Sequence, residues 1–271
     1  MAEQQSDAPT FDELTITRGI VETFTADFLD SLDLDVALVG AGPANLTAAR
    51  VLGNMGVRIA VFERNLQIGG GIWGGGMLMP RIVIGEGAAH LMTECGVRLR
   101  PYRDGCVVAD AVEAVTKLTA AACDAGARIW VGMEVEDVVI DDEARISGVV
   151  INWGAVTAAH LHVDPLAVHA RCVIDGTGHP AEVCRVVLDK VPGAKFDTPF
   201  DCVPGEASMH AVRGEAALVP NTREVYPGLV VSGMAANACM RSPRMGAIFG
   251  GMLLSGERAA QVAAEVVARR R

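Results

Sequence analysis

The sequence has little positive charge and few aromatic side chains. Of its 271 residues, 23 are Lys or Arg and 33 are Asp or Glu, which gives a formal net charge of −10 at pH 7. A protein that follows the phosphates of a nucleic acid would present a basic face, so this balance argues against that class. Aromatic residues make up only 4%, so small and branched aliphatic side chains must fill the interior.

Paired cysteines, an export signal and a long apolar run are also missing. The seven cysteines are dispersed without a C-x-x-C pair, which is typical of reduced intracellular thiols rather than of a disulfide framework. The segment 1–10 lacks the basic and then apolar pattern of a signal peptide. Apolar runs such as 36–39 and 247–254 are much shorter than the ~20 residues of a membrane span. We therefore expect a cytoplasmic protein without a nucleic-acid or membrane partner.

Glycine and small apolar residues are abundant instead. Hydrophobic residues make up 51% of the chain and charged residues 21%, which is enough for a full core and argues against wholesale disorder. The 30 glycines are about 11% of the 271 residues, above an average of ~7%. We expect residues 1–9 to form a disordered tail and residues 10–271 to form a single domain.

Residues 35–62 have the pattern of a βαβ unit. The short apolar run 35–39 ends at a glycine and predicts a strand buried on both faces of a parallel sheet. A helix over 43–55 and a second strand over 58–62 follow. Further helices are expected at 10–25, where residues 10–13 match a capping box, and at 87–95, 109–125 and 246–269. Further strands are expected at 128–131, 134–140, 146–153, 170–174 and 229–231, and the segment 189–225 reads as irregular.

The turn after the first strand, Gly40-Ala-Gly42-Pro-Ala-Asn45, predicts a nucleotide site. Gly40 permits a tight turn, and Gly42 lets the backbone approach a pyrophosphate at the start of the following helix. Asn45 stands where the motif has its third glycine, and its amide is expected to turn toward phosphate. Glu63 lies 21 residues after Gly42, at the position where an acid binds the ribose hydroxyls and favours NAD or FAD over NADP.

A second glycine turn, Asp175-Gly-Thr-Gly178, follows a later buried strand. Two such turns are the mark of an α/β, Rossmann-like fold of the glutathione-reductase type, which binds FAD or NAD. This fold has a central parallel sheet and a small β-hairpin or three-stranded layer. Fold alone leaves the chemistry open, so a flavin- or NAD-dependent oxidoreductase remains an alternative, and a lone G-x-G is also compatible with a plain tight turn.

Several segments together are similar to one family, the thiamine thiazole synthases, which make the adenylated thiazole precursor of thiamine. The resemblance spans about residues 13 to 265. The matching segments are GAGPAN (40–45), Glu63-Arg64, the glycines of 69–76, GVVINW (148–153), LHVDPL (161–166), DGTGH (175–179) and Arg244-Met245-Gly246. The sequence departs from the usual pattern at Asn45, Gly74 and Ala247.

The resemblance implies a transferase of thiamine biosynthesis that consumes NAD as a substrate. Nicotinamide is lost, the ADP-ribose part condenses with glycine, and sulfur enters before the ring closes. Eukaryotic members take this sulfur from a cysteine of their own chain, and His162 stands at that position here, without a cysteine anywhere in residues 124–171. Histidine there is the pattern of archaeal-type members, which implies free sulfide and multiple turnovers.

The resemblance also implies a metal site at Asp164 and His179, with Fe(II) as the metal. Carboxylate and imidazole ligands suit divalent iron, and two protein ligands leave positions open for substrate and sulfide. In the family the carboxylate crosses a subunit interface, so a homo-oligomer is expected, and the resemblance alone implies that it is an octamer. Without the family, Asp164 before a proline reads as a turn residue and His179 as a helix cap. His162 reads either as a half-buried polar residue or as a nucleotide contact and proton carrier.

The remaining expected site residues come from the same comparison of motifs. Arg244 is expected to hold the carboxylate of glycine, because a guanidinium forms a bidentate pair with it. The residues expected to line the dinucleotide pocket are Gly40, Gly42, Asn45, Glu63, Arg64, Gly71, Val135, His162 and Met234. By composition alone, Val135 and Met234 are better explained as plain core positions.

Two alternatives to a sulfide-dependent synthase stay open. A flavin- or NAD-binding redox protein of the same fold would carry a flavin absorbance band. A non-catalytic protein that binds NAD or the thiazole adduct would retain its ligand without turnover.

Overall fold

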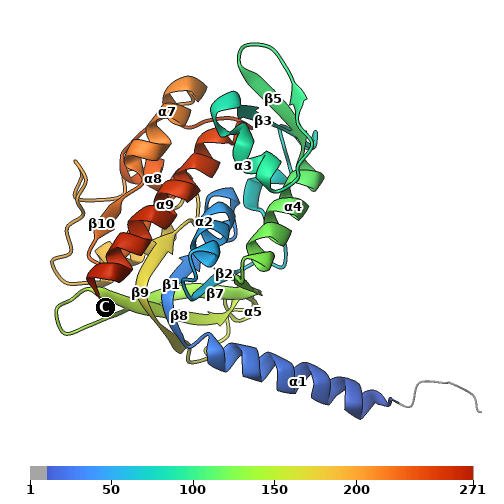
Figure 1. The fold of residues 1–271 in the computed structure, drawn as a ribbon. Coiled ribbons are helices and arrows are strands. Elements are labelled where there is room, and N and C mark those ends of the chain that lie inside the picture. Colours follow the sequence, from blue (N-terminus) through green and yellow to red (C-terminus); the bar gives the residue numbers. More distant parts are fainter. Residues whose placement is uncertain (1–10, 271) are drawn as a thin grey trace, which may run out of the picture.

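The computed structural model describes residues 11–270, and its main sheet is parallel at the centre (Figure 1). Six strands follow the order β10-β11-β9-β1-β2-β6. They are β1 (Asp33–Val39), β2 (Ile59–Glu63), β6 (Arg128–Val131), β9 (Leu166–Asp175), β10 (Glu224–Tyr226) and β11 (Leu229–Val231). β1 pairs in parallel with β2 and β9, and only the short β10 runs antiparallel to its neighbour β11 within this order. The predicted α/β Rossmann-like class is confirmed, whereas the tail predicted at 1–9 lies outside the described residues.

Two antiparallel layers are attached to this sheet. The hairpin of β7 (Met133–Ile140) and β8 (Ile146–Trp153) pairs with the first half of β9. A separate sheet of order β3-β5-β4 is built from β3 (Arg81–Gly85), β4 (Arg100–Pro101) and β5 (Cys106–Asp110). The predicted hairpin is confirmed at its expected position, and the small three-stranded layer is present.

Both faces of the central strands are buried, as the short apolar runs predict. Along β1, Val36 and Leu38 belong to one apolar core, while Ala37 and Val39 belong to the core on the opposite face. Successive side chains of a strand point to opposite faces, so a strand covered on both sides is apolar throughout. In Figure 1, α2 (Pro43–Asn54), α4 (Ala111–Asp124) and α9 (Gly250–Arg269) lie together on one side of the sheet.

The opposite face is covered by shorter elements. Apolar residues of α6 (Glu182–Lys190) and α8 (Met234–Cys239) share a core with the β7–β8 hairpin. α7 (Ala211–Asn221) packs beside α9 and α8. The segment 189–225 is therefore less irregular than predicted, because it contains α7 and the start of β10. The remaining short helices are η1 (Gly70–Ile72), η2 (Glu86–Ala88), α3 (Ala89–Glu94) and α5 (Gly154–Ala158).

α9 packs closely on α2 through small residues. A Cβ at Gly256 would lie 2.1 Å from the carbonyl oxygen of Ala44, so no larger residue fits there without a backbone shift. Because α2 carries the glycine turn at its start, this contact fixes the turn relative to the C-terminal helix. The helix begins at Gly250 rather than at residue 246 as predicted.

α1 (Glu13–Asp30) projects away from the rest of the chain (Figure 1) and has no buried residue. Its N-cap is Asp12 and not residue 10, which the capping box suggested. The carboxylate of Asp12 accepts a hydrogen bond from the backbone N–H of Thr15. The helix also continues to Asp30, five residues beyond the predicted end. Among the helices of residues 11–270, none is long and apolar enough to cross a membrane.

Candidate functional site

The first glycine turn lies where β1 ends and α2 begins. Gly40 has φ of +86°, and a Cβ there would lie 2.8 Å from the carbonyl oxygen of Gly176. Both facts require glycine at this position. Gly42 caps α2, and Pro43 occupies the first helical position, where its missing N–H costs nothing. The free N–H groups of the first helical turn are therefore available to an anion.

Asn45 holds this turn from inside the protein. Its side chain is fully buried, and its Nδ2 donates to the carbonyl oxygens of Val39 and Gly40, each at 2.9 Å. Its Oδ1 accepts from the hydroxyl of Ser232 at 2.7 Å. Because the amide is saturated by these contacts and does not line the cavity described below, Asn45 shapes the turn. The expected direct contact with phosphate is not what the structure shows.

Glu63 ends β2 and faces the same turn. Its side chain is buried, and Oε2 accepts a hydrogen bond from the backbone N–H of Ala41 at 2.9 Å. Oε1 accepts from both the backbone N–H and the side-chain amide of Asn65, each at 2.9 Å. Oε1 thus accepts two hydrogen bonds and Oε2 one, so acceptor capacity for a hydroxyl group of a ligand remains on Oε2.

The second glycine turn lies at the end of β9, directly beside the first. Asp175 is fully buried, and its Oδ1 accepts from the backbone N–H and the hydroxyl of Thr177 at 3.0 and 2.7 Å. Its Oδ2 accepts from the backbone N–H of Cys184 in α6 at 2.9 Å. The hydroxyl of Thr177 in turn accepts from the N–H of Glu182 at 2.7 Å. Asp175 thus fixes the turn and the start of α6 as one unit.

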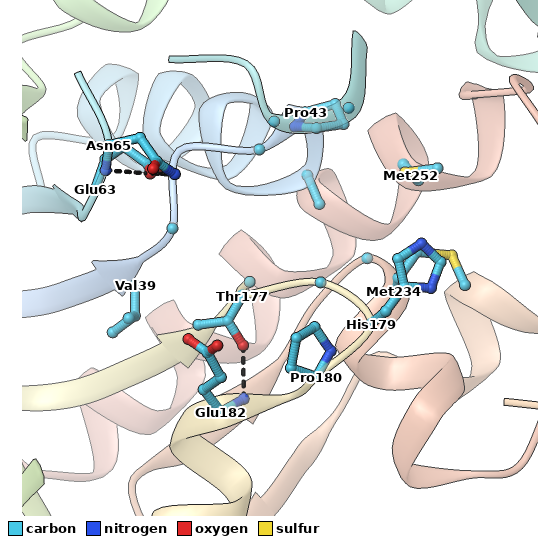
Figure 2. Close-up of a pocket in the computed structure, with 18 of the residues that line it drawn as sticks. Val39, Pro43, Glu63, Asn65, Thr177, His179, Pro180, Glu182, Met234 and Met252 are labelled. Carbon is cyan, nitrogen blue, oxygen red and sulfur yellow. Dashed lines mark hydrogen bonds between the residues drawn. The ribbon is translucent and has the colours of Figure 1, made fainter. Parts of the chain in front are cut away.

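A cavity of about 480 Å³ opens at the carboxyl ends of β1, β2 and β9, between these turns. Ligands of open α/β sheets bind at this edge, and the volume lies within the usual range of ligand pockets. In Figure 2, Pro43 marks the start of α2, while Thr177, His179 and Pro180 follow the turn after β9. The predicted residues that line the cavity are Gly40, Gly42, Glu63, Arg64, Gly71, Val135, His179, Met234 and Arg244.

Glycine keeps much of this lining free of side chains. A Cβ built at Gly71, Gly178 or Gly246 meets no other atom within 4 Å, and all three residues border the cavity. A ligand can therefore approach the backbone there.

His162 and Asp164 lie outside this cavity. Both are exposed on the loop between α5 and β9, whereas His179 belongs to the cavity lining. Within residues 11–270, no group of three or more His, Cys, Asp and Glu side chains is placed to hold a metal ion. A single chain therefore supplies one of the two predicted metal ligands to the cavity.

Several residues of the site carry no sequence signal. Glu182 forms an ion pair with Arg64, whose Nη1 lies 2.8 Å from Oε1, and both side chains line the cavity. Glu206 contacts Nδ1 of His179. Glu206 is distant in sequence from the glycine motifs, and only the fold brings it to the site, whereas Glu182 lies shortly after the second glycine turn. Met209 and Met252 also line the cavity.

Cysteine is missing from the lining of this cavity, as far as residues 11–270 describe it. Cys172 and Cys184, the first two cysteines after the predicted sulfur-donor position, are fully buried. Burial raises the pKa of both thiols well above the usual value. Because the thiolate is the reactive form, neither cysteine is poised as a nucleophile.

Comparison with known proteins places the chain in one family. The model described as the Thi4 family matches residues 17–249. The chain is 54% identical over 258 residues to the thiamine thiazole synthase of Methanothrix thermoacetophila, covering 95% of this chain and 98% of that protein. It is 50% identical over 252 residues to the thiamine thiazole synthase of Methanosarcina acetivorans, with coverage of 93% and 96%.

Solved structures agree with these relatives. The crystal structure of Thermovibrio ammonificans THI4 is 42% identical and superimposes with a TM-score of 0.91 over 97% of this chain and 99% of that one. A geranylgeranyl bacteriochlorophyll reductase-like protein from Thermoplasma acidophilum shares the fold, with a TM-score of 0.57 at 17% identity. The glycine turns, the cavity and these matches agree: the chain belongs to the Thi4 family, the thiamine thiazole synthases of thiamine biosynthesis.

Proposed function

We propose that this chain makes an adenylated thiazole from NAD, glycine and sulfide, with release of nicotinamide, in an Fe(II)-dependent reaction with multiple turnovers. The observation that carries the proposal is the cavity itself, which joins a dinucleotide-type glycine turn to His179 and Arg244. A redox protein of this fold requires the turn and the acid of β2, but it has no need of the other two residues.

The first glycine turn and Glu63 are proposed to bind the ADP part of NAD. The N-terminal N–H groups of α2 attract the pyrophosphate, and Glu63 accepts hydrogen bonds from the ribose hydroxyls. A buried carboxylate at this position disfavours a 2′-phosphate by charge repulsion. Arg64 and Glu182, which form an ion pair beside Glu63, border the same stretch of cavity.

Arg244 is proposed to bind the carboxylate of glycine. Its side chain lines the cavity, and the N–H of the same residue donates to the carbonyl oxygen of Ala207 at 3.0 Å. The backbone is thereby held while the guanidinium remains available. A guanidinium and a carboxylate form two parallel hydrogen bonds, which would orient the amino group of glycine toward the ribose carbonyl.

The sulfur atom is proposed to come from free sulfide. His162 stands at the position of the sulfur-donating cysteine of eukaryotic relatives, and within residues 11–270 the cavity has no cysteine lining it. The thiols of Cys172 and Cys184 are buried away from it. A chain that keeps its own sulfur atoms is not consumed by the reaction, which allows more than one turnover.

His179 of one chain and Asp164 of a second are proposed to hold Fe(II). An imidazole and a carboxylate suit divalent iron, which when bound would polarise the substrate carbonyl and hold sulfide. The placement of Asp164 on an exposed loop, away from the cavity of its own chain, favours a ligand that serves a neighbour. This proposal makes a homo-oligomer necessary, and the family resemblance suggests an octamer.

Apolar surface around Asp164 supports such an assembly. Leu161 and Val163 on the same loop are 61% and 49% exposed, Leu166 at the start of β9 is 60% exposed, and Trp153 is 50% exposed. α1, which has no buried residue, and Phe11 just before it expose a further set of large apolar side chains: Phe11, Leu14, Ile16, Ile20, Val21 and Leu29. Large apolar patches of this kind mark protein–protein contacts.

An anaerobic incubation tests the proposed substrates. Purified protein is mixed with NAD, glycine, sulfide and Fe(II), each is then omitted in turn, and the small molecules are analysed by mass spectrometry. We expect an adenylated thiazole and free nicotinamide only in the complete mixture. NAD that stays intact in every mixture, or a protein that carries a flavin absorbance band, would contradict the proposal.

A further inference from the structure

We propose that Glu206 is a positioning residue for His179, which it holds in one tautomer with Nε2 free to donate an electron pair into the cavity. The inference rests on the proposed role of His179 as a ligand of the metal. Glu206 is 27 positions from His179 in the sequence and lies on a different loop.

The contact itself determines the tautomer. The Glu206 carboxylate lies within hydrogen-bonding distance of Nδ1 of His179. An ionised carboxylate can only accept, so the shared proton is carried by Nδ1. In a neutral imidazole the other nitrogen, Nε2, then has a lone pair, which is the form that binds a metal.

Glu206 approaches the ring from outside the cavity. His179 lines the cavity and its side chain is 50% exposed, whereas Glu206 does not line it and is only 13% exposed. The two nitrogens lie on different edges of the imidazole ring. Holding Nδ1 from the protein side therefore leaves Nε2 on the edge that can meet a ligand. Carboxylate partners of this kind are common behind metal-binding histidines.

A backbone ladder fixes Glu206 in register with Arg244. Ala207, the next residue, donates its N–H to the carbonyl oxygen of Ser242 at 3.0 Å and accepts from the N–H of Arg244 at 3.0 Å. His210 donates to the carbonyl oxygen of Arg244 at 2.9 Å. The same ladder thus places the carboxylate behind His179 and the guanidinium proposed to bind glycine. The proposed metal ligand His179 and the proposed glycine-binding residue Arg244 are thereby positioned relative to one another.

The first test measures the tautomer in the protein as purified, without metal. Nitrogen NMR of the His179 ring is expected to show the Nδ1–H form in the wild type and a mixture of tautomers in Glu206→Ala. Glu206→Gln keeps the size of the side chain and should change the tautomer ratio of the His179 ring in the same direction by a smaller amount. This variant replaces Glu206→Ala in the test if Glu206→Ala folds poorly. A wild-type ring protonated at Nε2, or an unchanged tautomer in both variants, would overturn the proposal.

The second test measures affinity for Co(II), a spectroscopic substitute for Fe(II), by titrating its visible absorption. Loss of the partner behind a histidine ligand typically weakens metal binding ~10–100-fold, and we expect a loss in this range for Glu206→Ala with NAD affinity unchanged. The control Glu143→Gln replaces an exposed glutamate in the β7–β8 turn and should bind Co(II) as the wild type does.

The variant His179→Ala distinguishes failure of the proposed metal site from failure of the proposed role of Glu206. If Co(II) binding persists in His179→Ala, the proposed metal site itself fails. If His179→Ala loses Co(II) while Glu206→Ala binds it normally, the metal site stands and only the role of Glu206 fails. The double variant should lose no more Co(II) affinity than His179→Ala alone, because Glu206 is proposed to act through the imidazole ring of His179.

Discussion

Hydrogen bonds of two single residues, Asn45 and Glu63, shape the glycine turn after β1. Asn45 binds the carbonyl oxygens of Val39 and Gly40 from the core, and Glu63 binds the N–H of Ala41 from the end of β2. The turn is therefore held through both its donors and its acceptors before any ligand arrives. A preformed turn loses little conformational freedom on binding, which favours affinity.

Asn45→Ala should weaken the fold. The change removes the side-chain partner of the Gly40 carbonyl oxygen and of the Ser232 hydroxyl, while the Val39 carbonyl oxygen keeps the N–H of Gly176. Each buried group that loses its partner costs ~1–3 kcal/mol. We expect the free energy of unfolding to fall by about 2 kcal/mol or more in urea titrations. Asn54→Ala, an exposed position near the end of α2, is the matched control and should change stability by less than about 0.5 kcal/mol.

Arg244→Ala should act on glycine alone. Loss of a charged hydrogen-bonding partner costs ~1.5–3 kcal/mol, so KM for glycine is expected to rise about tenfold or more while the NAD affinity is unchanged. Steady-state kinetics with varied glycine measure this effect. Arg213→Ala, an exposed arginine on α7, should leave the glycine dependence as it is, and an unchanged KM in Arg244→Ala would remove its proposed role.

At the scale of elements, α7 caps α9. Oε2 of Glu215 accepts the N–H of Gly251 in the first turn of α9 at 2.7 Å. Its Oε1 is buried and has no hydrogen-bond partner among residues 11–270. Burial raises the pKa of this carboxyl, and the hydrogen bond from Gly251 opposes the rise. The charged form is thus less favoured in the folded chain than in the unfolded chain.

Glu215→Gln should change the dependence of stability on pH. A carboxyl whose folded pKa is raised contributes stability that is fully present below its unfolded pKa of ~4.3 and is lost as pH rises through the folded pKa. We expect the wild type to lose stability relative to Glu215→Gln between about pH 4 and neutrality, measured by unfolding at several pH values. The control Glu265→Gln, on the exposed side of α9, should show the same dependence of stability on pH as the wild type. Parallel curves of unfolding free energy against pH for all three proteins would contradict this account.

The central elements were predictable because their pattern is local. The runs that form β1, β2 and β6 are short, apolar and bounded by glycine or charge, and the β7–β8 hairpin alternates around a turn. Partners distant in sequence were not predictable: Asn45 is oriented inward by Ser232, 187 positions away, and Glu206 meets His179 through a segment without periodicity. Local pattern thus predicts the central strands and the hairpin, but it missed α7 in the segment 189–225 and does not predict which side chains meet between elements.

At the scale of the whole molecule, the proposed metal site is divided between copies. Asp164→Ala and His179→Ala proteins should each be inactive yet still bind NAD, because Glu63 and the glycine turn are intact. Mixed oligomers assembled from the two variants contain some sites with both native ligands, so activity should return in part. Recovery is measured by comparing the amount of thiazole formed by the mixed oligomers with the amount formed by each variant alone. Absence of any recovery in oligomers shown to be mixed would contradict a shared site.

The fate of sulfur tests the central claim most directly. Purified protein is incubated anaerobically with NAD, glycine, Fe(II) and sulfide whose sulfur is a heavy isotope. The masses of the product and of the intact protein are then measured by mass spectrometry. We predict labelled adenylated thiazole in excess of one molecule per subunit and a protein of unchanged mass. Unlabelled thiazole at no more than one per subunit, with a protein lighter by the sulfur it has lost, would contradict the account.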